Sequence, residues 1–236
     1  MVGRQIRRVA LLFLAHAVGT ANITLVIALS PSIEASLALG MAGFGFIISA
    51  YYGAMLLLAL PVGWVADRFG LKVVLVVAHS LLAIGLWVLT FASGIMLAAV
   101  ALALCGCGYA FINPATARAV LIWFPAQERA TAMGIKQTGV PTGGVIAAFI
   151  AATVDADWRM VVLVMATLTA VVGVGYFGLR LAETREHSPV RFLRCGDYFV
   201  CRASPISMRV PGYIVLGRRR FLPIWCCLSI RRWMQR

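Results

Sequence analysis

The sequence contains few charged residues, and acidic residues are the rarest of these. Among 236 residues, Asp and Glu together number 8, and charged residues of both signs make up 12%. Soluble domains carry about 25% charged residues and about 45–50% apolar residues. The apolar share here is 62%. The composition therefore excludes a water-soluble domain and indicates an integral membrane protein.

Side chains that enzymes and metal sites use are also scarce. The chain has 3 His and 6 Cys. Cys105 and Cys107 lie inside an apolar stretch, and no cysteine stands at metal-ligand spacing with a histidine. The sequence shows no disulfide framework and no pairing of a nucleophile with a base. We therefore predict no enzyme activity, no metal site and no cofactor.

Long apolar stretches follow one another along the chain. Each is long enough for the roughly 20 residues that cross a bilayer as a helix. They predict an all-α integral membrane protein with six transmembrane helices. The stretches are Val9–Ser30, Gly43–Ala66, Val73–Phe91, Ile95–Phe124, Ala130–Val154 and Trp158–Leu181.

The turns between these stretches alternate in charge. Basic residues occur before the first stretch and in the turns at 67–72 and 128–136. The opposite turns contain Glu34 and Asp157. Loops rich in Lys and Arg remain on the cytoplasmic side. We therefore predict that the N and C termini are both cytoplasmic.

A charged, glycine-containing segment separates the second stretch from the third. Gly63–Lys72 reads G-W-V-A-D-R-F-G-L-K. Asp, Arg and Lys each cost about 2.5–3.5 kcal/mol at the centre of a membrane helix, so we expect a tight hairpin at the membrane surface. Gly63 would let helices approach closely, and Gly70 would allow the turn.

This segment resembles the G-x-x-x-D-R-x-G-x-K loop between helices two and three of the major facilitator superfamily. Trp123–Gly134 is similar to that family's link between helices four and five, and Gln137–Gly144 to its Gly/Pro-rich start of helix five. The resemblance covers residues 9–186 and implies the amino-terminal half of a twelve-helix transporter. It implies a gating network of Gly63, Asp67, Arg68, Gly70, Lys72, Glu128 and Arg129.

The chain departs from the family pattern at two positions. Leu102–Gly106 lacks the Arg that the family often carries before a Gly in helix four, and Val140 separates Gly139 from Pro141. Both departures weaken a drug-efflux interpretation without excluding it. The relatives that look nearest are bacterial permeases of poorly defined or organic-anion substrate. The resemblance thus implies a multi-pass protein of the bacterial inner (plasma) membrane.

Polar residues within the stretches share helix faces. His16 and Thr20 are four residues apart, as are Tyr109 and Asn113. The resemblance implies a central cavity lined by helices one, two, four and five. Each of three residues also has a structural alternative. Thr20 could hydrogen-bond within its own helix, and His16 could be a neutral structural histidine. Arg118 could extend to the lipid headgroups. The candidate cavity residues are His16, Thr20, Tyr109, Asn113, Arg118 and Lys136.

Two cations near one cavity would favour a carboxylate or phosphate substrate, so Arg118 and Lys136 are candidate anion-binding residues. His16 is a candidate proton carrier because its unperturbed pKa is about 6.5. Gly139 and Gly143 form a small-x-x-x-small pair that favours close helix packing, and Pro141 permits a bend. Packing and gating both remain open as roles for these three residues.

The composition changes after residue 189. We predict a six-helix bundle over 1–189 and a basic cytoplasmic tail over 190–236. The tail contains ten Arg and a single acidic residue, Asp197. It predicts either a segment that binds anionic lipid or an unstructured product of a frameshift. Because most of the excess positive charge lies in this tail, we predict no nucleic-acid partner.

These features predict secondary active transport of a small organic anion, coupled to a proton, across the lipid bilayer. One half has no opposing wall, so transport would require a second half-transporter or a self-dimer. An inactive remnant of a disrupted transporter gene and proton-coupled drug efflux are the alternatives.

Overall fold

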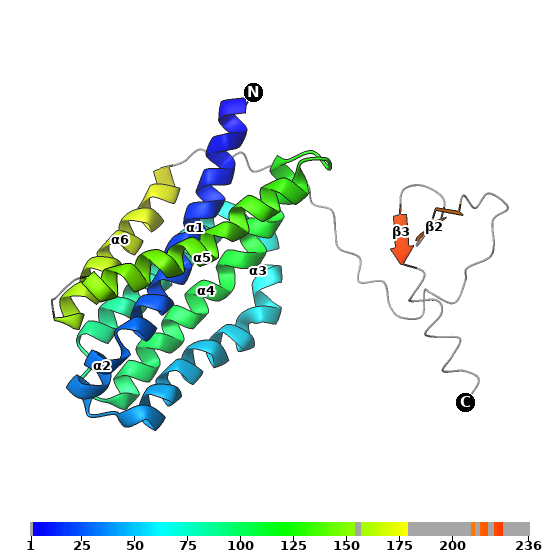
Figure 1. Cartoon of the computed structure of the whole chain (residues 1–236). Helices are drawn as coiled ribbons and strands as arrows, with labels where there is room; N and C mark the ends of the chain where they lie inside the picture. The colour runs from blue at the N-terminus through cyan, green and yellow to red at the C-terminus, as the bar shows by residue number, and fades with distance from the viewer. Residues whose placement is uncertain (1, 154–156, 179–208, 211–212, 217–219, 224–236) are drawn as a thin grey trace, which may run out of the picture. The chain divides into compact units, whose positions relative to one another are not determined.

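The computed structural model describes residues 2–153, 157–178, 209–210, 213–216 and 220–223. The chain divides into two units, Met1–Arg185 and Glu186–Arg236. The first unit is a bundle of helices (Figure 1), which confirms the predicted fold class. Its helices are α1 (Val2–Ala28), α2 (Ser30–Leu37), α3 (Gly40–Thr90), α4 (Ile95–Trp123), α5 (Arg129–Thr153) and α6 (Trp158–Gly178).

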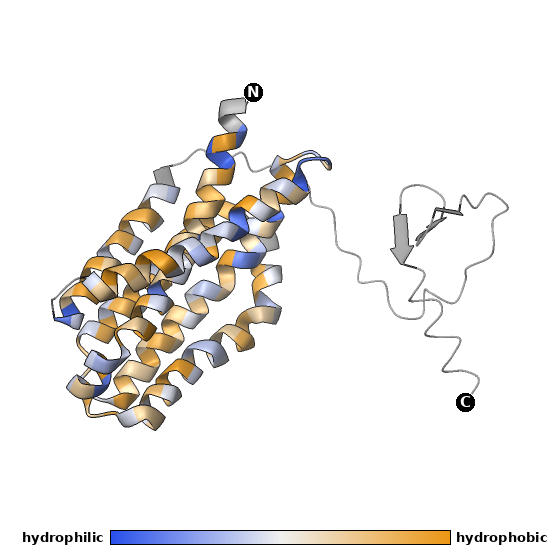
Figure 2. Cartoon of the chain, in the orientation of Figure 1, coloured by the Kyte–Doolittle hydropathy of each residue, from blue (hydrophilic) through white to orange (hydrophobic). Residues whose placement is uncertain are grey.

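Apolar residues cover most of these helices, and the hydrophilic ones gather mainly toward helix ends (Figure 2). Five described stretches are long and apolar enough to cross a membrane: Gln5–Ala28, Gly40–Ala59, Arg68–Thr90, Ile95–Trp123 and Trp158–Tyr176. Helix α5 occupies the fifth predicted stretch, but it is not among these five candidate membrane spans. It contains Lys136, Gln137 and several threonines, which lower its hydropathy. The count of six spans and the cytoplasmic termini remain predictions.

Helix α3 is a hairpin of two helical segments. Its first turn reaches the start of α4, because a Cβ at Gly43 would lie 3.5 Å from Ile95 Cδ1. Its last residue, Thr90, is also close to Ile95 in sequence. The chain reverses between these ends at Gly70, where φ is 80° and ψ is 163°. This positive φ favours glycine and places the turn within the predicted segment.

A short helix, α2, lies where the sequence predicts only a turn containing Glu34. Pro31 stands in its first turn, where its missing N–H costs nothing. Ala38 ends the helix in the left-handed conformation. Ile33 and Leu37 are buried, so the segment packs on the bundle instead of crossing a membrane.

Glycines determine how closely the helices approach. A Cβ at Gly139 would lie 2.5 Å from the carbonyl oxygen of Phe13, and a Cβ at Gly143 would overlap the carbonyl of Ala17. Only glycine therefore permits this contact between α5 and α1. Helix α5 continues through Pro141.

Arginines bind the carbonyl groups at helix ends. Arg129 donates from Nε to Phe124 O at 3.0 Å and from NH2 to Leu121 O at 2.9 Å, which satisfies the end of α4. Arg159 donates to the carbonyls of Thr90 and Ala92, at and just after the end of α3. These contacts satisfy carbonyls that a helix leaves unpaired at its C-terminus.

The second unit contains three short antiparallel strands, β1 (Arg209–Val210), β2 (Tyr213–Leu216) and β3 (Arg220–Pro223). Ile214 pairs with Arg209 on one side and Leu222 on the other. The composition of this segment predicts no regular structure. The remaining residues of the predicted tail lie outside the described residues.

Candidate functional site

Lys136 of α5 is buried, with 2% of its surface exposed. Its ammonium donates to Asn113 Oδ1 at 3.1 Å, to Thr116 Oγ1 at 3.1 Å and to His16 Nε2 at 3.5 Å. These partners come from α4 and α1 and occupy all three N–H donors of the lysine. We call Lys136, His16, Asn113 and Thr116 the Lys136 cluster.

The partners of His16 indicate its tautomer. Its Nδ1 lies 3.3 Å from the carbonyl oxygen of Leu12, an acceptor only. Nδ1 therefore carries the hydrogen, and Nε2 keeps the lone pair that accepts from Lys136. In this arrangement His16 is neutral. A protonated His16 could not accept a hydrogen bond from an ammonium group.

The Lys136 cluster has no acidic member. Helices α1, α4, α5 and α6 contain no Asp or Glu, and the only acidic residue of α3 is Asp67, near its turn. Buried ionised groups in membrane proteins usually pair with an opposite charge or face a water-filled path. Among the described residues, every hydrogen-bond partner of the Lys136 ammonium is neutral. It is therefore suited to bind an anion that comes from outside the chain.

Asn113 connects this buried charge to the surface of the bundle. Its side chain is exposed, whereas those of Lys136, His16 and Thr116 are buried. One helical turn away, Thr20 Oγ1 lies 3.1 Å from the hydroxyl of Tyr109, and both residues are half-buried. A polar strip thus follows the contact between α1 and α4.

Five of the six predicted cavity residues lie in this strip, and Arg118 does not. It is a half-buried residue of α4. At about 100° per residue, it stands about 140° around the helix from Asn113 and about 200° from Thr116. None of the hydrogen bonds of Lys136 involves it. Lys136 is therefore the cation that these contacts place in the strip, and anion binding by Arg118 remains a prediction.

The predicted gating residues are divided between the α3 turn and the start of α5. Arg68 is exposed and Lys72 is half-buried, while the side chain of Asp67 lies outside the described residues. Glu128 is exposed, and the gating network that would join it to Arg68 and Lys72 remains a prediction.

Two of these gating residues have structural environments that the sequence analysis did not expect. Among the described residues nothing lies within 4 Å of a Cβ built at Gly63, so a close helix approach there remains a prediction. Arg129 binds the carbonyls at the end of α4.

Sequence analysis missed a second buried histidine. His79 of α3 is completely buried, and its Nδ1 lies 2.8 Å from Leu75 O. Its Nε2 has no hydrogen-bond partner among the described residues. Its ring centroid lies 5.0 Å from that of Tyr176 in α6. The only signal in the sequence is a lone histidine in an apolar stretch.

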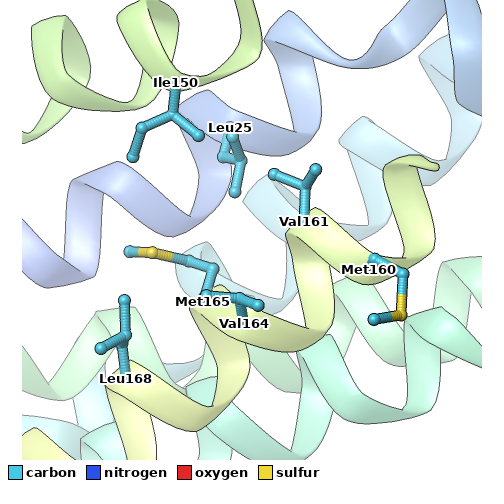
Figure 3. A pocket seen from close by; sticks show the side chains of 7 residues that line it. All are labelled: Leu25, Ile150, Met160, Val161, Val164, Met165 and Leu168. Carbon is cyan, nitrogen blue, oxygen red and sulfur yellow. The ribbon is translucent and has the colours of Figure 1, made fainter. Parts of the chain in front are cut away.

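A pocket of about 190 Å³ lies between α1, α5 and α6 (Figure 3). Its lining contains only aliphatic and methionine side chains, so it offers no group that could bind a charged ligand. The candidate site is therefore the Lys136 cluster and not this pocket. The lining residues are Leu25, Ile150, Met160, Val161, Val164, Met165 and Leu168.

The family model described as Major Facilitator Superfamily matches residues 11–232. The chain belongs to this superfamily. Its members include the relatives below, and the match extends into the basic segment after residue 189.

Among curated relatives, a probable sulfoacetate transporter of Cupriavidus necator is 29% identical over 145 residues, covering 59% of this chain and 33% of the relative. A galacturonate transporter of Dickeya chrysanthemi is 32% identical over 152 residues, covering 61% and 42%. A hexuronate transporter of Escherichia coli is 29% identical over 169 residues, covering 68% and 38%. This chain thus spans less than half the length of these superfamily members.

Among solved structures, a bacterial homolog of the human lysosomal transporter Spinster, in an inward-facing and occupied conformation, matches with a TM-score of 0.67. The match covers 79% of this chain and 46% of that chain at 17% sequence identity. It supports the superfamily fold and carries no information about the substrate.

Proposed function

We propose that this chain contributes to secondary active transport of a small organic anion across the bacterial inner membrane, with Lys136 as the anion-binding group. The observation that carries this proposal is a buried ammonium whose described partners are all neutral. In a low-dielectric bundle, such a charge favours a ligand that supplies the missing negative charge.

The relatives support the same substrate class. Those described above are named for sulfoacetate, galacturonate and hexuronate, and each of these is an organic anion. A cationic drug would instead have to bind near an unneutralised positive charge. The Lys136 cluster therefore favours anion transport over drug efflux. By the family's alternating-access mechanism, transport itself requires a second half or a second copy of the bundle.

Binding can be tested apart from transport. The full chain, reconstituted in lipid nanodiscs, should bind galacturonate more tightly than galactose, which carries a hydroxymethyl group in place of the carboxylate. Lys136→Met keeps the length of the side chain and removes its charge. It should weaken galacturonate binding by about 100-fold and leave any binding of galactose unchanged.

Lys136→Arg is the matched control, since it keeps a positive charge at the same position. It should retain most of the preference for galacturonate over galactose. Equal binding of the two sugars by the wild type, or equal galacturonate binding by wild type and Lys136→Met, would refute the proposal.

A further inference from the structure

We propose that binding of the anion is coupled to uptake of a proton. The anion would accept the hydrogen bond that Lys136 now donates to His16, and His16 would then take up the proton. This inference rests on the proposed function and specifies how its binding site is coupled to protons. It assigns to His16 the role of proton acceptor and to Lys136 the role of the shared hydrogen-bond donor.

One lone pair connects the two residues. Nε2 of His16 accepts from the ammonium of Lys136 at 3.5 Å, while Nδ1 is directed to Leu12 O. The neutral imidazole has no second acceptor atom to offer. His16 can therefore either accept from Lys136 or take up a proton, but it cannot do both.

A bound anion would release this constraint. One oxygen of the incoming carboxylate accepts the Lys136 N–H that now points to His16. The freed Nε2 then forms an N–H bond with a proton from solvent. One negative and one positive charge enter together, so the net charge of the cluster is the same before and after binding. Without the anion, two cations would face each other across 3.5 Å, which is unfavourable in a buried site.

The surroundings of His16 contain few other groups that could control its proton. Helix α5 contributes Lys136. Helix α4 contributes Asn113, which shares the Lys136 ammonium with His16, and Tyr109 one turn away, beside Thr20. From α3, His79 is the other buried histidine among the described residues. From α6, the hydroxyl of Tyr176 donates to the backbone oxygen of Leu11. Lys136 is the charged group in direct contact.

Asn113 offers the route by which the anion could reach the pair. It accepts from Lys136 at 3.1 Å, and its side chain is exposed. A carboxylate that arrives beside Asn113 can meet the lysine without displacing the buried contact to Thr116. The lysine side chain is long and flexible, so moving one N–H from His16 toward the exposed side needs no change in the backbone.

Linkage makes this exchange measurable. If anion binding favours protonation of His16, protonation must favour anion binding by the same factor. Galacturonate remains ionised between about pH 5 and 8, since carboxylates titrate near pH 4. Its affinity for the wild-type chain in nanodiscs should therefore fall as pH rises through this range, by up to about tenfold per pH unit.

His16→Gln is the decisive variant. Its amide oxygen can accept from Lys136, but the side chain takes up no proton in this range. Galacturonate should still bind, with an affinity that changes by less than about twofold between pH 5 and 8. His79→Gln removes the other buried histidine and should keep the wild-type slope. Lys136→Arg should also keep the slope, because the charge of arginine does not titrate here.

The outcomes separate the two proposals. If the wild type binds galacturonate and Lys136→Met does not, but His16→Gln keeps the wild-type slope, the exchange is wrong and anion binding at Lys136 stands. Loss of the slope in Lys136→Arg would assign it to the lysine and also overturn the exchange. Absence of galacturonate binding by the wild type at every pH would remove the proposed function itself.

Discussion

His16 and His79 begin from the same local arrangement and have different environments. Each histidine directs Nδ1 to the carbonyl four residues earlier in its own helix, at 3.3 Å for His16 and 2.8 Å for His79. Both side chains are buried. His16 then meets the ammonium of Lys136, whereas the Nε2 of His79 has no described partner and its ring packs near Tyr176.

The comparison shows that burial of a histidine in a membrane helix does not by itself identify a functional residue. The helix supplies the first hydrogen bond in both cases, so that bond carries no information about function. The second nitrogen distinguishes them. Contact with a cation ties the protonation of His16 to another charge, while the ring of His79 lies near that of Tyr176 in α6.

The largest expected effect comes from separating α1 from α5, because their contact brings Lys136 to His16. Gly143→Ala would press a methyl group against the backbone of Ala17. We expect a loss of about 1–3 kcal/mol in stability, together with loss of galacturonate binding. Thermal melting in detergent and binding in nanodiscs would measure both.

The adjacent glycine provides a control for this change. A Cβ at Gly144 would be 3.7 Å from Thr24 Oγ1, an ordinary contact. Gly144→Ala should therefore melt at or slightly above the wild-type temperature, since alanine favours a helix by up to about 1 kcal/mol over glycine. Equal destabilisation by both variants would show that the close approach of α1 and α5 is not the cause.

A smaller effect is expected from giving Lys136 a partner within the chain. Asn113→Asp would place a carboxylate where Oδ1 now lies 3.1 Å from the ammonium. The new ion pair should compete with the ligand and lower galacturonate affinity by about 10- to 100-fold, while the melting temperature rises.

Asn22→Asp is the control for this variant. It makes the same substitution at a residue whose observed side-chain partner is the hydroxyl of Thr169 instead of a cation. There the new charge is buried without a cation, so the melting temperature should fall instead. An unchanged galacturonate affinity in Asn113→Asp would show that the ligand does not use Lys136.

The smallest effect is expected at His79. His79→Phe keeps an aromatic ring beside Tyr176. It removes the Nδ1 contact with Leu75 O but also the unpartnered Nε2, so the net change in stability should be less than about 1 kcal/mol. His16→Phe should cost about 1–3 kcal/mol, because it deprives Lys136 of an acceptor. Comparable losses in both variants, measured by thermal melting, would remove the distinction between the two histidines.

Much of the bundle could be predicted because membrane helices appear as long apolar stretches. The predicted stretch Ile95–Phe124 differs from α4 by one residue, and the α3 turn lies at a glycine within the predicted segment. The short helix α2 was missed because eight residues with a proline near the start give no span-length signal. Its formation depends on packing of Ile33 and Leu37.

The members of the site could be predicted separately but not as a set. His16 and Lys136 were both candidates, yet they are 120 residues apart, and periodicity relates only residues of one helix. Their contact depends on how α1 crosses α5, which Gly139 and Gly143 determine through close approach. The same limitation placed Arg118 with Lys136, although it occupies another face of α4.

Arg159 affects how the orientation of the chain in the membrane should be interpreted. It stands beside Asp157, at the end of the bundle predicted to face away from the cytoplasm, where a positive charge opposes the usual distribution. Its guanidinium binds the carbonyls of Thr90 and Ala92 and lies 4.5 Å from the ring centre of Trp158. The partial negative charge at the end of α3 offsets that cation in the folded bundle. Arg159 should therefore weigh less than an unengaged arginine when the charges on the two sides are counted to assign topology.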